Sequence, residues 1–479
     1  MRLRCRVLAT LGCFAVLAGC AGRNVVPSGS GGQANAAAAA PTATPRGLYT
    51  DAQLRTPADP NARAEPKAGE VWTAANGVPV RSETYDADFS DLAPFGAATG
   101  NRRIVGLGES SHGVGDYSLI KTRLIKYLHE KKGFDVIVFE YDMFDDYVVN
   151  KTLATSTPEQ SMFSGIFAVW WSTESLGLFD YLQQQAKTKH PLILAGMDVQ
   201  ENGMIDQRAA AMQAAIAPVD AKMAATAASY DPTYVNLINQ AEFSYDGTAL
   251  KAQLPALKKF YSDLDVWMGA HMNAMVAASA DKNMPRVLQA VARYTPNFAV
   301  EILQSIATKG VGGNPPRDAG MAGDVDFIAR TLYPNKKLVI WAHNYHLQRQ
   351  NTYANTGSLV AKDFGSSYYA TGLLPYRGQG DYNGGPTYTQ KPAPAQSIDM
   401  NMYYTRWRWS FLDFSALTKN TGDAWTYKKQ LWDDFGVYPF PAFVAKDAWD
   451  GIVYVDEIHP PHYISPPNAR AIRRGSPLP

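Results

Sequence analysis

One short stretch, Gly106-Leu-Gly-Glu-Ser-Ser-His-Gly113, constrains the fold of this chain more than any other. It follows the apolar run Arg103-Ile-Val-Gly-Leu107 and precedes a segment, from about Asp116 to Lys132, whose apolar residues recur at helical spacing. This order predicts a buried strand, a tight turn and a helix. The turn places a carboxylate, Glu109, and an imidazole, His112, at the carboxyl end of the strand, which is the edge where open α/β sheets bind their ligands.

Further apolar runs predict that this strand belongs to a larger sheet. Each run is rich in Val, Ile and Leu and ends at a polar residue or a glycine turn. The main candidates are Arg103–Gly108, Asp135–Glu140, Pro191–Asp198 and Lys337–His343, and two later candidates are Tyr368–Leu374 and Ile452–Asp456. Continuous apolar strands that alternate with helical segments are typical of parallel sheets covered on both faces. We therefore expect an α/β fold with a mostly parallel central sheet flanked by helices.

Two segments depart from this alternation of strand and helix. Residues from about 200 to 309 are rich in Ala, Met, Leu and Lys and have helical periodicity, so we expect a large helical insertion that could roof a cleft. The segment from Pro375 to Ser397 is rich in Gly, Pro, Gln and Tyr and predicts a long surface loop near the active edge. We expect the main domain to span residues 71–479.

Residues 1–20 resemble a bacterial lipoprotein signal peptide. Three arginines precede an apolar stretch, Val7 to Leu17, that is too short for an ordinary membrane span, and Leu17-Ala-Gly-Cys20 resembles a lipobox. Cys20 would then become a lipidated N-terminus, and an ordinary secretory signal that contains Cys is the alternative. The low-complexity residues 21 to about 70 predict a flexible tether. We expect a protein anchored by lipid to the bacterial cell envelope, at the outer membrane.

Charge and cysteine content exclude several classes of function. The 479 residues carry a formal net charge of +1 and no basic stripe, which argues against nucleic acid as a partner. All three cysteines, Cys5, Cys13 and Cys20, lie in the leader, so the mature chain offers no disulfide and no cysteine nucleophile. The sequence contains no Gly-x-Ser-x-Gly elbow, phosphate-binding loop or His-Glu-x-x-His motif. Activated water is therefore the expected nucleophile.

Two further charged residues are candidates for the site. Lys121 lies on the apolar stripe of the helix that follows His112, where a lysine is costly unless its charge is paired. The alternative is that its head group reaches past the stripe to solvent. Glu140 closes the second apolar run and could be the partner of an imidazole or a lysine. It could equally be a surface carboxylate in a loop with three neighbouring aspartates, and the sequence leaves both interpretations of Glu140 open.

Two histidines, His343 and His346, follow the fourth apolar run at the expected active edge. They could form half of a metal site or supply polar contacts to a reacting carbonyl. His459 and His462 have the same spacing but lie in a Pro-rich tail, so they are weaker candidates. His129 is expected on a charged helix face with no role in the site.

With these residues in place, the chain resembles the erythromycin esterase family. The matching segments are Gly108-Glu-Ser-Ser-His-Gly113, Leu119-Ile-Lys-Thr-Arg-Leu124, Gly133–Glu140, Trp171-Ser-Thr-Glu174, Gly196-Met-Asp198, Arg317–Ala322 and Trp341–His346. They follow the family's order and cover most of residues 100–460. The lipobox and the long tether differ from the best-known resistance enzymes of the family.

The resemblance implies metal-independent hydrolysis of a small-molecule carboxylic ester, with a macrolide lactone among the candidates and no cofactor. His112 matches the family's general base, which acts on a water molecule. Glu109 and Glu140 match its supporting acidic positions, and Lys121 stands where some members have Arg. Lys121 and one of the late histidines, His343 or His346, would stabilise the oxyanion or the leaving alkoxide.

Two other functions stay open. In the first, the cluster of Glu109, His112, His343 and His346 binds a divalent metal such as Zn²⁺ or Mn²⁺ in a metal-dependent hydrolase. In the second, the protein is an envelope lipoprotein that binds glycans without hydrolysing them. The aromatic residues available for stacking on sugars would be Tyr403, Tyr404, Trp407 and Trp409, although the alternating tryptophans are more typical of a packed strand face.

Overall fold

The computed structural model describes residues 48–59, 67–84, 88–201, 203–310, 313–391, 393–395, 397–414, 417–433, 436 and 442–466. The expected signal peptide, Cys20 and residues 21–47 of the tether lie outside this range. The later part of the tether is folded, because α1 (Asp51–Leu54) buries Leu54 and the next residue, Arg55, forms a β-bridge to Trp407. The folded domain therefore begins before the expected residue 71. None of the described helices is both long and apolar enough to span a membrane.

The central sheet is mixed but mostly parallel. Across the sheet, the strands follow in the order β1 (Val78–Pro79), β8 (Trp409–Asp413), β11 (Gly451–Ile458), β6 (Tyr368–Asp381), β2 (Ile104–Leu107), β5 (Lys337–Trp341), β3 (Phe134–Asp142) and β4 (Ile193–Asp198). Every neighbouring pair from β11 to β4 is parallel. The pairs β1–β8 and β8–β11 are antiparallel, as is β7 (Thr387–Gln390) with the end of β6. The expected α/β class and its main strands are confirmed.

The parallel strands are apolar on both faces because their side chains alternate between two cores. In β5, Leu338 and Ile340 pack into one core, whereas Val339 and Trp341 pack into the other. All of these side chains are buried. This is the pattern expected of strands covered by helices on both sides.

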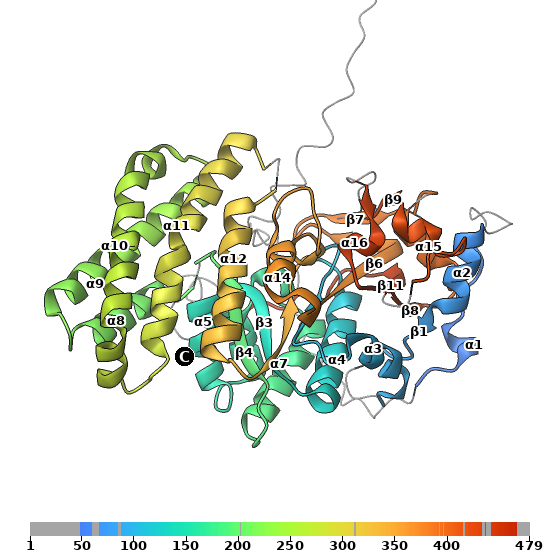
Figure 1. Cartoon of the computed structure of the whole chain (residues 1–479), viewed down its shortest axis with the longest axis horizontal. Coiled ribbons are helices and arrows are strands. Elements are labelled where there is room, and N and C mark those ends of the chain that lie inside the picture. Colours follow the sequence, from blue (N-terminus) through green and yellow to red (C-terminus); the bar gives the residue numbers. More distant parts are fainter. Residues whose placement is uncertain are drawn as a thin grey trace, which may run out of the picture.

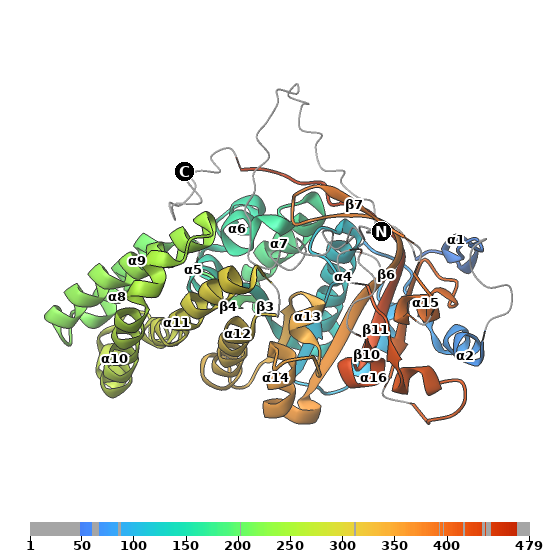
Figure 2. The ribbon, with the colours of Figure 1, turned by 90° about the horizontal axis from the view of Figure 1, so that it is seen from above.

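Helices cover both faces of the sheet (Figures 1 and 2). One core includes residues of α3 (Ala93–Thr99), α4 (Gly115–Lys132), α6 (Pro158–Gly165) and α7 (Thr173–Ala186), and the other includes residues of α5 (Met143–Thr152), α12 (Pro315–Phe327) and α14 (Thr356–Phe364). The shorter helices are α2 (Ala68–Asn76), α13 (Asn344–Leu347), α15 (Ile398–Tyr403) and α16 (Ala445–Ala448), and β9 (Lys429–Gln430) pairs with β10 (Phe443–Val444).

The expected helical insertion is present. It consists of α8 (Ile205–Ile216), α9 (Ala221–Ser244), α10 (Thr248–Ala278) and α11 (Met284–Thr308). In α10 the buried Leu257, Tyr261, Leu264 and Met268 recur at three- and four-residue spacing, which gives the helix one apolar face. The four helices lie together at one end of the molecule, beside α5 and α12, rather than across the sheet (Figures 1 and 2).

The segment expected to be a long loop, Pro375 to Ser397, is mostly a β-hairpin. Strand β6 continues to Asp381 and pairs with β7 in register from Gly378–Gln390 to Asp381–Thr387. The glycines and the proline that suggested a loop, Gly384, Gly385 and Pro386, lie in the turn of this hairpin. The location near the active edge is confirmed, because Asp381 forms a β-bridge to Gly113.

Burial decides two interpretations: the packed strand face is confirmed for the tryptophans, and the charged helix face is wrong for His129. The aromatic residues considered for glycan stacking are buried, with exposed fractions of 1% for Tyr403, 9% for Tyr404, 6% for Trp407 and 0% for Trp409. They pack the domain and offer no stacking surface for sugars. His129 is also buried. Its Nδ1 lies 2.6 Å from the Tyr181 hydroxyl, and its ring stacks on His190.

Candidate active site

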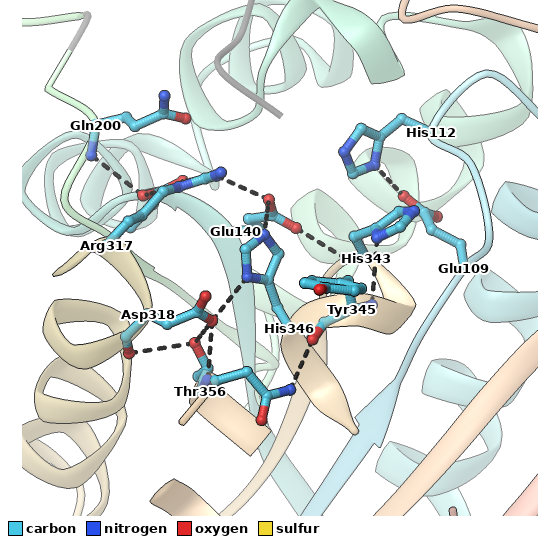
Figure 3. Close-up of polar contacts among 12 residues, drawn as sticks. Glu109, His112, Glu140, Gln200, Arg317, Asp318, His343, Tyr345, His346 and Thr356 are labelled. Atoms are coloured by element: carbon cyan, nitrogen blue, oxygen red, sulfur yellow. Dashed lines mark hydrogen bonds and ion pairs between the residues drawn. The ribbon is translucent and has the colours of Figure 1, made fainter. Parts of the chain in front are cut away.

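The predicted site residues meet at the carboxyl ends of three adjacent strands. Glu109 and His112 follow β2, Glu140 lies near the end of β3, and His343 follows β5, which lies between those two strands. The rings of His112 and His343 are 5.2 Å apart at their centroids. The backbone N–H of His343 donates to Glu140 Oε2 at 2.8 Å, so strands distant in sequence are joined at this edge (Figure 3).

Glu109 is the centre of the first half of the site. Its Oε1 accepts the indole N–H of Trp170 at 2.8 Å and lies 2.7 Å from Nδ1 of His112. Its Oε2 accepts a hydrogen bond from Lys121 Nζ at 2.7 Å. Burial raises the pKa of the Glu109 carboxyl, but the charge of Lys121 and the contacts with His112 outweigh burial and hold this pKa below its ordinary value. Glu109 is therefore an anion that orients His112.

Lys121 is fully buried on α4, so the expectation that its charge is paired is confirmed and the solvent-exposed alternative is wrong. Besides its contact with Glu109, its ammonium group lies 4.1 Å from the centroid of the Trp341 ring. Burial lowers the pKa of Lys121 to about 8, although Glu109 and Glu140 favour the charged form. Lys121 is thus the counter-ion of Glu109, and it loses its proton at a lower pH than an ordinary lysine does.

The orientation of His112 follows from its contact with Glu109. A carboxylate accepts hydrogen bonds, so Nδ1 of the neutral ring carries the proton and Nε2 carries the lone pair. Trp170 packs edge-on against the imidazole at 4.7 Å and fixes the ring from the side. The arrangement prepares Nε2 of His112 to accept a proton.

Glu140 belongs to a second buried network and is not a surface residue. Its exposed fraction is 1%, and its Oε1 accepts a hydrogen bond at 2.8 Å from Arg317, which also binds both oxygens of Asp198 at the end of β4. The neighbouring aspartates that suggested an exposed loop are buried too. Burial raises the pKa of Glu140, but the nearby His346, Arg317 and His112 outweigh burial and hold this pKa well below its ordinary value. Glu140 is therefore ionised.

The two late histidines have different partners. His343 Nδ1 accepts the backbone N–H of Tyr345 at 3.2 Å, which caps α13 and leaves the proton of the neutral ring on Nε2. His346 lies between two carboxylates, with Nδ1 at 2.8 Å from Asp318 and Nε2 at 3.4 Å from Glu140 (Figure 3). Only His343 faces His112, so His346 is placed to support the network around Glu140.

The weaker candidates, His459 and His462, lie beside the site and bind carboxylates of two helices. The backbone N–H of His459 donates to Asp116 at the start of α4 at 2.6 Å, and His462 Nδ1 lies 2.5 Å from Glu174 on α7. The side chain of His462 is 82% exposed. These contacts hold the C-terminal segment across the edge of the sheet.

The side chains considered as metal ligands do not fit a metal centre. No group of three or more His, Cys, Asp or Glu side chains within the described part of the chain is arranged to hold a metal ion. The Glu109 carboxylate is instead neutralised by Lys121, and His346 is shared between Asp318 and Glu140. We therefore derive no chemical step through a metal.

Sequence reasoning missed four members of the cluster as site residues: Trp170, Asp198, Arg317 and Asp318. The signal for Asp198 was present, because it closes the third apolar run in the same way as Glu140 closes the second. Arg317 and Asp318 lie in a segment that matches the family, but their helix, α12, is 119 residues away from Asp198 along the chain. Nothing in the local sequence shows that these residues meet.

The fold and this cluster define an α/β protein whose charged site is built from the ends of adjacent parallel strands. The family model described as erythromycin esterase matches residues 129–458. The chain belongs to the erythromycin esterase family, and its relatives are hydrolases.

Comparison with individual proteins agrees with this family. The chain is similar to a putative hydrolase, YbfO, of Bacillus subtilis (strain 168), with 27% identity over 432 residues that cover 84% of this chain and 94% of the relative. The crystal structure of a Bacillus cereus protein superposes with a TM-score of 0.68 at 18% identity and covers 83% of this chain and 98% of that chain. A mutant of the erythromycin esterase EreC in its open conformation has a TM-score of 0.59 at 19% identity and covers 79% and 96%. At these identities the two structures show the shared fold alone.

Proposed function

We propose that the protein hydrolyses a carboxylic ester by attack of a water molecule, with His112 as the general base. The observation that carries this proposal is the 2.7 Å contact between His112 Nδ1 and Glu109, whose carboxylate is itself fixed by Lys121 and Trp170. A base whose tautomer and orientation are set by a buried carboxylate is the arrangement that general-base catalysis requires.

In the proposed reaction, Nε2 of His112 removes a proton from water while the water oxygen bonds to the carbonyl carbon of the ester. The carbonyl π electrons move to the oxygen and form a tetrahedral oxyanion. When this intermediate collapses, the C–O bond to the alcohol breaks, and the imidazolium of His112 returns its proton to the departing alkoxide. The products are an acid and an alcohol, and His112 is neutral again. The anionic Glu109 stabilises the imidazolium between the two steps.

The neighbouring residues have distinct supporting roles. His343 faces His112 and carries its proton on Nε2, so it is the donor that we assign to the oxyanion. Glu140 is a positioning residue, because it accepts the backbone N–H of His343. Lys121, which was expected to stabilise the oxyanion, is bound to Glu109 instead and acts through that carboxylate.

The substrate class is an ester of a small molecule, and a macrolide lactone is the first candidate. The family model that matches residues 129–458 carries the name erythromycin esterase, which supports this choice. The buried aromatic cluster gives no support to a glycan-binding function.

The test is the incubation of the full chain and its His112→Ala variant with macrolides and with simple para-nitrophenyl esters, followed by mass spectrometry for the addition of one water. We expect His112→Ala to lose roughly 10²–10⁴-fold in kcat, because the base is removed. Thermal unfolding of the variant should resemble that of the wild type. His271→Ala, a histidine substitution in the helical insertion, is the control and should keep full activity.

Two outcomes contradict the proposal. One is an active His112→Ala variant. The other is loss of wild-type activity on chelation with recovery on addition of Zn²⁺ or Mn²⁺, which would instead support the metal-dependent alternative.

A further inference from the structure

The β6–β7 hairpin brings a third carboxylate, Asp381, to the turn that carries His112. The backbone N–H of Asp381 donates to the carbonyl of Gly113 at 2.9 Å, and the Ser111 hydroxyl donates to the carbonyl of Asp381 at 3.4 Å. These bonds join Asp381 to the residues on either side of His112. The β6–β7 hairpin therefore ends directly against the proposed catalytic turn.

The close fit of Asp381 depends on the glycine at position 113. A Cβ atom at Gly113 would lie 2.2 Å from Oδ1 and 2.3 Å from the carbonyl oxygen of Asp381. Both distances are far shorter than non-bonded contacts between carbon and oxygen, so a side chain would push the hairpin away. The glycine directly after His112 thus allows the carboxylate of Asp381 to lie against this turn.

The two oxygens of the Asp381 carboxylate have different surroundings. Oδ1 accepts the Tyr463 hydroxyl at 2.9 Å and the backbone N–H of Gly384 at 2.8 Å. Oδ2 has no hydrogen-bond donor among the residues that the structure describes, although Asp381 is only 4% exposed. Burial raises the pKa of Asp381, and Gly384, Tyr463 and His112 lower it, so His112 is an electrostatic neighbour of this carboxyl. Oδ2 is not fully buried, so water reaches it, and a hydrogen-bond donor of a ligand can take the place of that water.

An exposed aromatic ring lies beside this carboxylate. Tyr463, whose hydroxyl donates to Oδ1, is 37% exposed and is one of the few large apolar side chains on the surface of the described residues. Tyr463 comes from the C-terminal segment that follows β11, and in Figure 2 this segment crosses the edge of the sheet near β7. We name Asp381 and Tyr463 the polar lip. An acceptor oxygen beside an exposed ring suits a ligand that carries a hydrogen-bond donor on an otherwise apolar body.

We propose that the polar lip is part of the substrate site and that Asp381 is a specificity-determining residue, which accepts a hydrogen bond from a hydroxyl or ammonium group of the ester substrate. The inference rests on the proposed ester hydrolysis and adds the chemical class of the substrate. Esters that carry such a donor are preferred over esters of the same size that lack one.

The test compares para-nitrophenyl butyrate with the para-nitrophenyl esters of beta-hydroxybutyrate and beta-aminobutyrate. The measured quantity is the kcat/KM of each donor-bearing ester divided by the kcat/KM of para-nitrophenyl butyrate. We expect Asp381→Asn to lower this ratio about tenfold or more, because a neutral amide accepts a weaker hydrogen bond than a carboxylate does. If Asp381→Asn lowers the ratio for the hydroxyl ester alone, the preferred donor is neutral. If it lowers the ratio for the amino ester, the preferred donor is a cation.

Two further variants keep the test decisive. Tyr463→Phe retains the ring but removes the O–H that fixes Oδ1, so it should lower the same ratio by a smaller factor. Asp413→Asn is the matched control, because Asp413 also accepts a tyrosine hydroxyl, that of Tyr369, but lies where β8 pairs with the first residue of β11, Gly451. This is the opposite edge of the sheet from the site. The control should leave the ratio unchanged.

The inference fails if Asp381→Asn lowers kcat/KM equally for all three esters, which would indicate a merely structural role. It also fails if the wild type does not distinguish the three esters. If the wild type hydrolyses no ester at all, the proposed function fails as well, so the two failures are distinguishable.

Discussion

At the scale of single residues, the charge of Lys121 decides how Glu109 can act. The lysine is fully buried, and its ammonium group faces Glu109 and the Trp341 ring. An arginine at this position would stay charged at every pH that a protein tolerates. A lysine whose pKa is lowered to about 8 by burial loses its charge under mildly alkaline conditions. Because this residue is a lysine and not an arginine, the activity of the site should have an upper pH limit.

We expect the kcat/KM of the wild type to fall as the pH rises through about 8, because neutral Lys121 no longer balances Glu109. Lys121→Arg should extend the activity to higher pH, even if its different geometry lowers the maximum rate. The measurement is kcat/KM against pH for an ester that the wild type hydrolyses. Lys126→Arg, on the same helix and partly exposed, is the control and should keep the wild-type profile. Identical alkaline limits in the wild type and Lys121→Arg would contradict this role of Lys121.

At the scale of secondary-structure elements, Arg317 ties α12 to the ends of β3 and β4. Its guanidinium is 1% exposed and forms ion pairs with both Glu140 and Asp198. Both carboxylates are buried, so the arginine compensates for the cost of taking them out of water. The polar part of the link between helix and sheet therefore depends on Arg317, whereas Met321 and Val325 of α12 supply the apolar part in the shared core.

We expect Arg317→Ala to lower the free energy of unfolding by about 3–5 kcal/mol, because two buried carboxylates lose their counter-ion. Chemical denaturation followed by circular dichroism gives this value. Arg293→Ala removes the arginine of a half-exposed ion pair with Asp265 and should cost about 1 kcal/mol or less. An equal loss of unfolding free energy in the two variants would show that the buried ion pairs of Arg317 stabilise the fold no more than a half-exposed ion pair does.

The sequence predicted the elements of the parallel sheet better than the contacts between them. The apolar runs found β2 to β5, the first half of β6 and β11, because strands buried on both faces leave a continuous signal. The same argument placed Glu109, Glu140 and His343 at one edge. It could not find Trp170 or Arg317, since a buried tryptophan or arginine on a helix gives no local sign of its partner. The β6–β7 hairpin was missed because the turn residues hid the short strand beside them.

At the scale of the whole molecule, the helical insertion is held by a buried network of carboxyl groups. Arg208 on α8 binds Glu201 and Asp231 on α9, and the hydroxyl of Tyr261 on α10 donates to Asp231 at 2.9 Å. On the domain side, Asp145 of α5 accepts the backbone N–H of Met204 at 3.0 Å. Burial raises the pKa of Asp145 to about 7 and that of Glu201 to about 8. These acids are protonated in the fold at pH values where they ionise in the unfolded chain.

Stability should therefore fall with rising pH. A raised pKa in the folded state gives stability that is complete below the ordinary pKa of a carboxyl group and is lost as the pH rises through about 7 to 8. We expect the free energy of unfolding to decrease between about pH 5 and about pH 9, and we expect Glu201→Gln, which cannot ionise, to decrease less. Glu159→Gln, at an exposed position on α6, is the control. A pH dependence identical in the wild type and Glu201→Gln would contradict the assignment.

The position of β11 in the sheet has a consequence for biosynthesis. This strand, Gly451–Ile458, lies between β6 and β8, and the segment directly after it binds the start of α4 and, through Tyr463, Asp381. Residues 451–458 are made after both β6 and β8, so on the ribosome each of these two strands waits with an unpaired edge. Premature termination just before residue 451 therefore leaves a chain with an exposed parallel edge and an unfinished site, a natural substrate for chaperones and proteases.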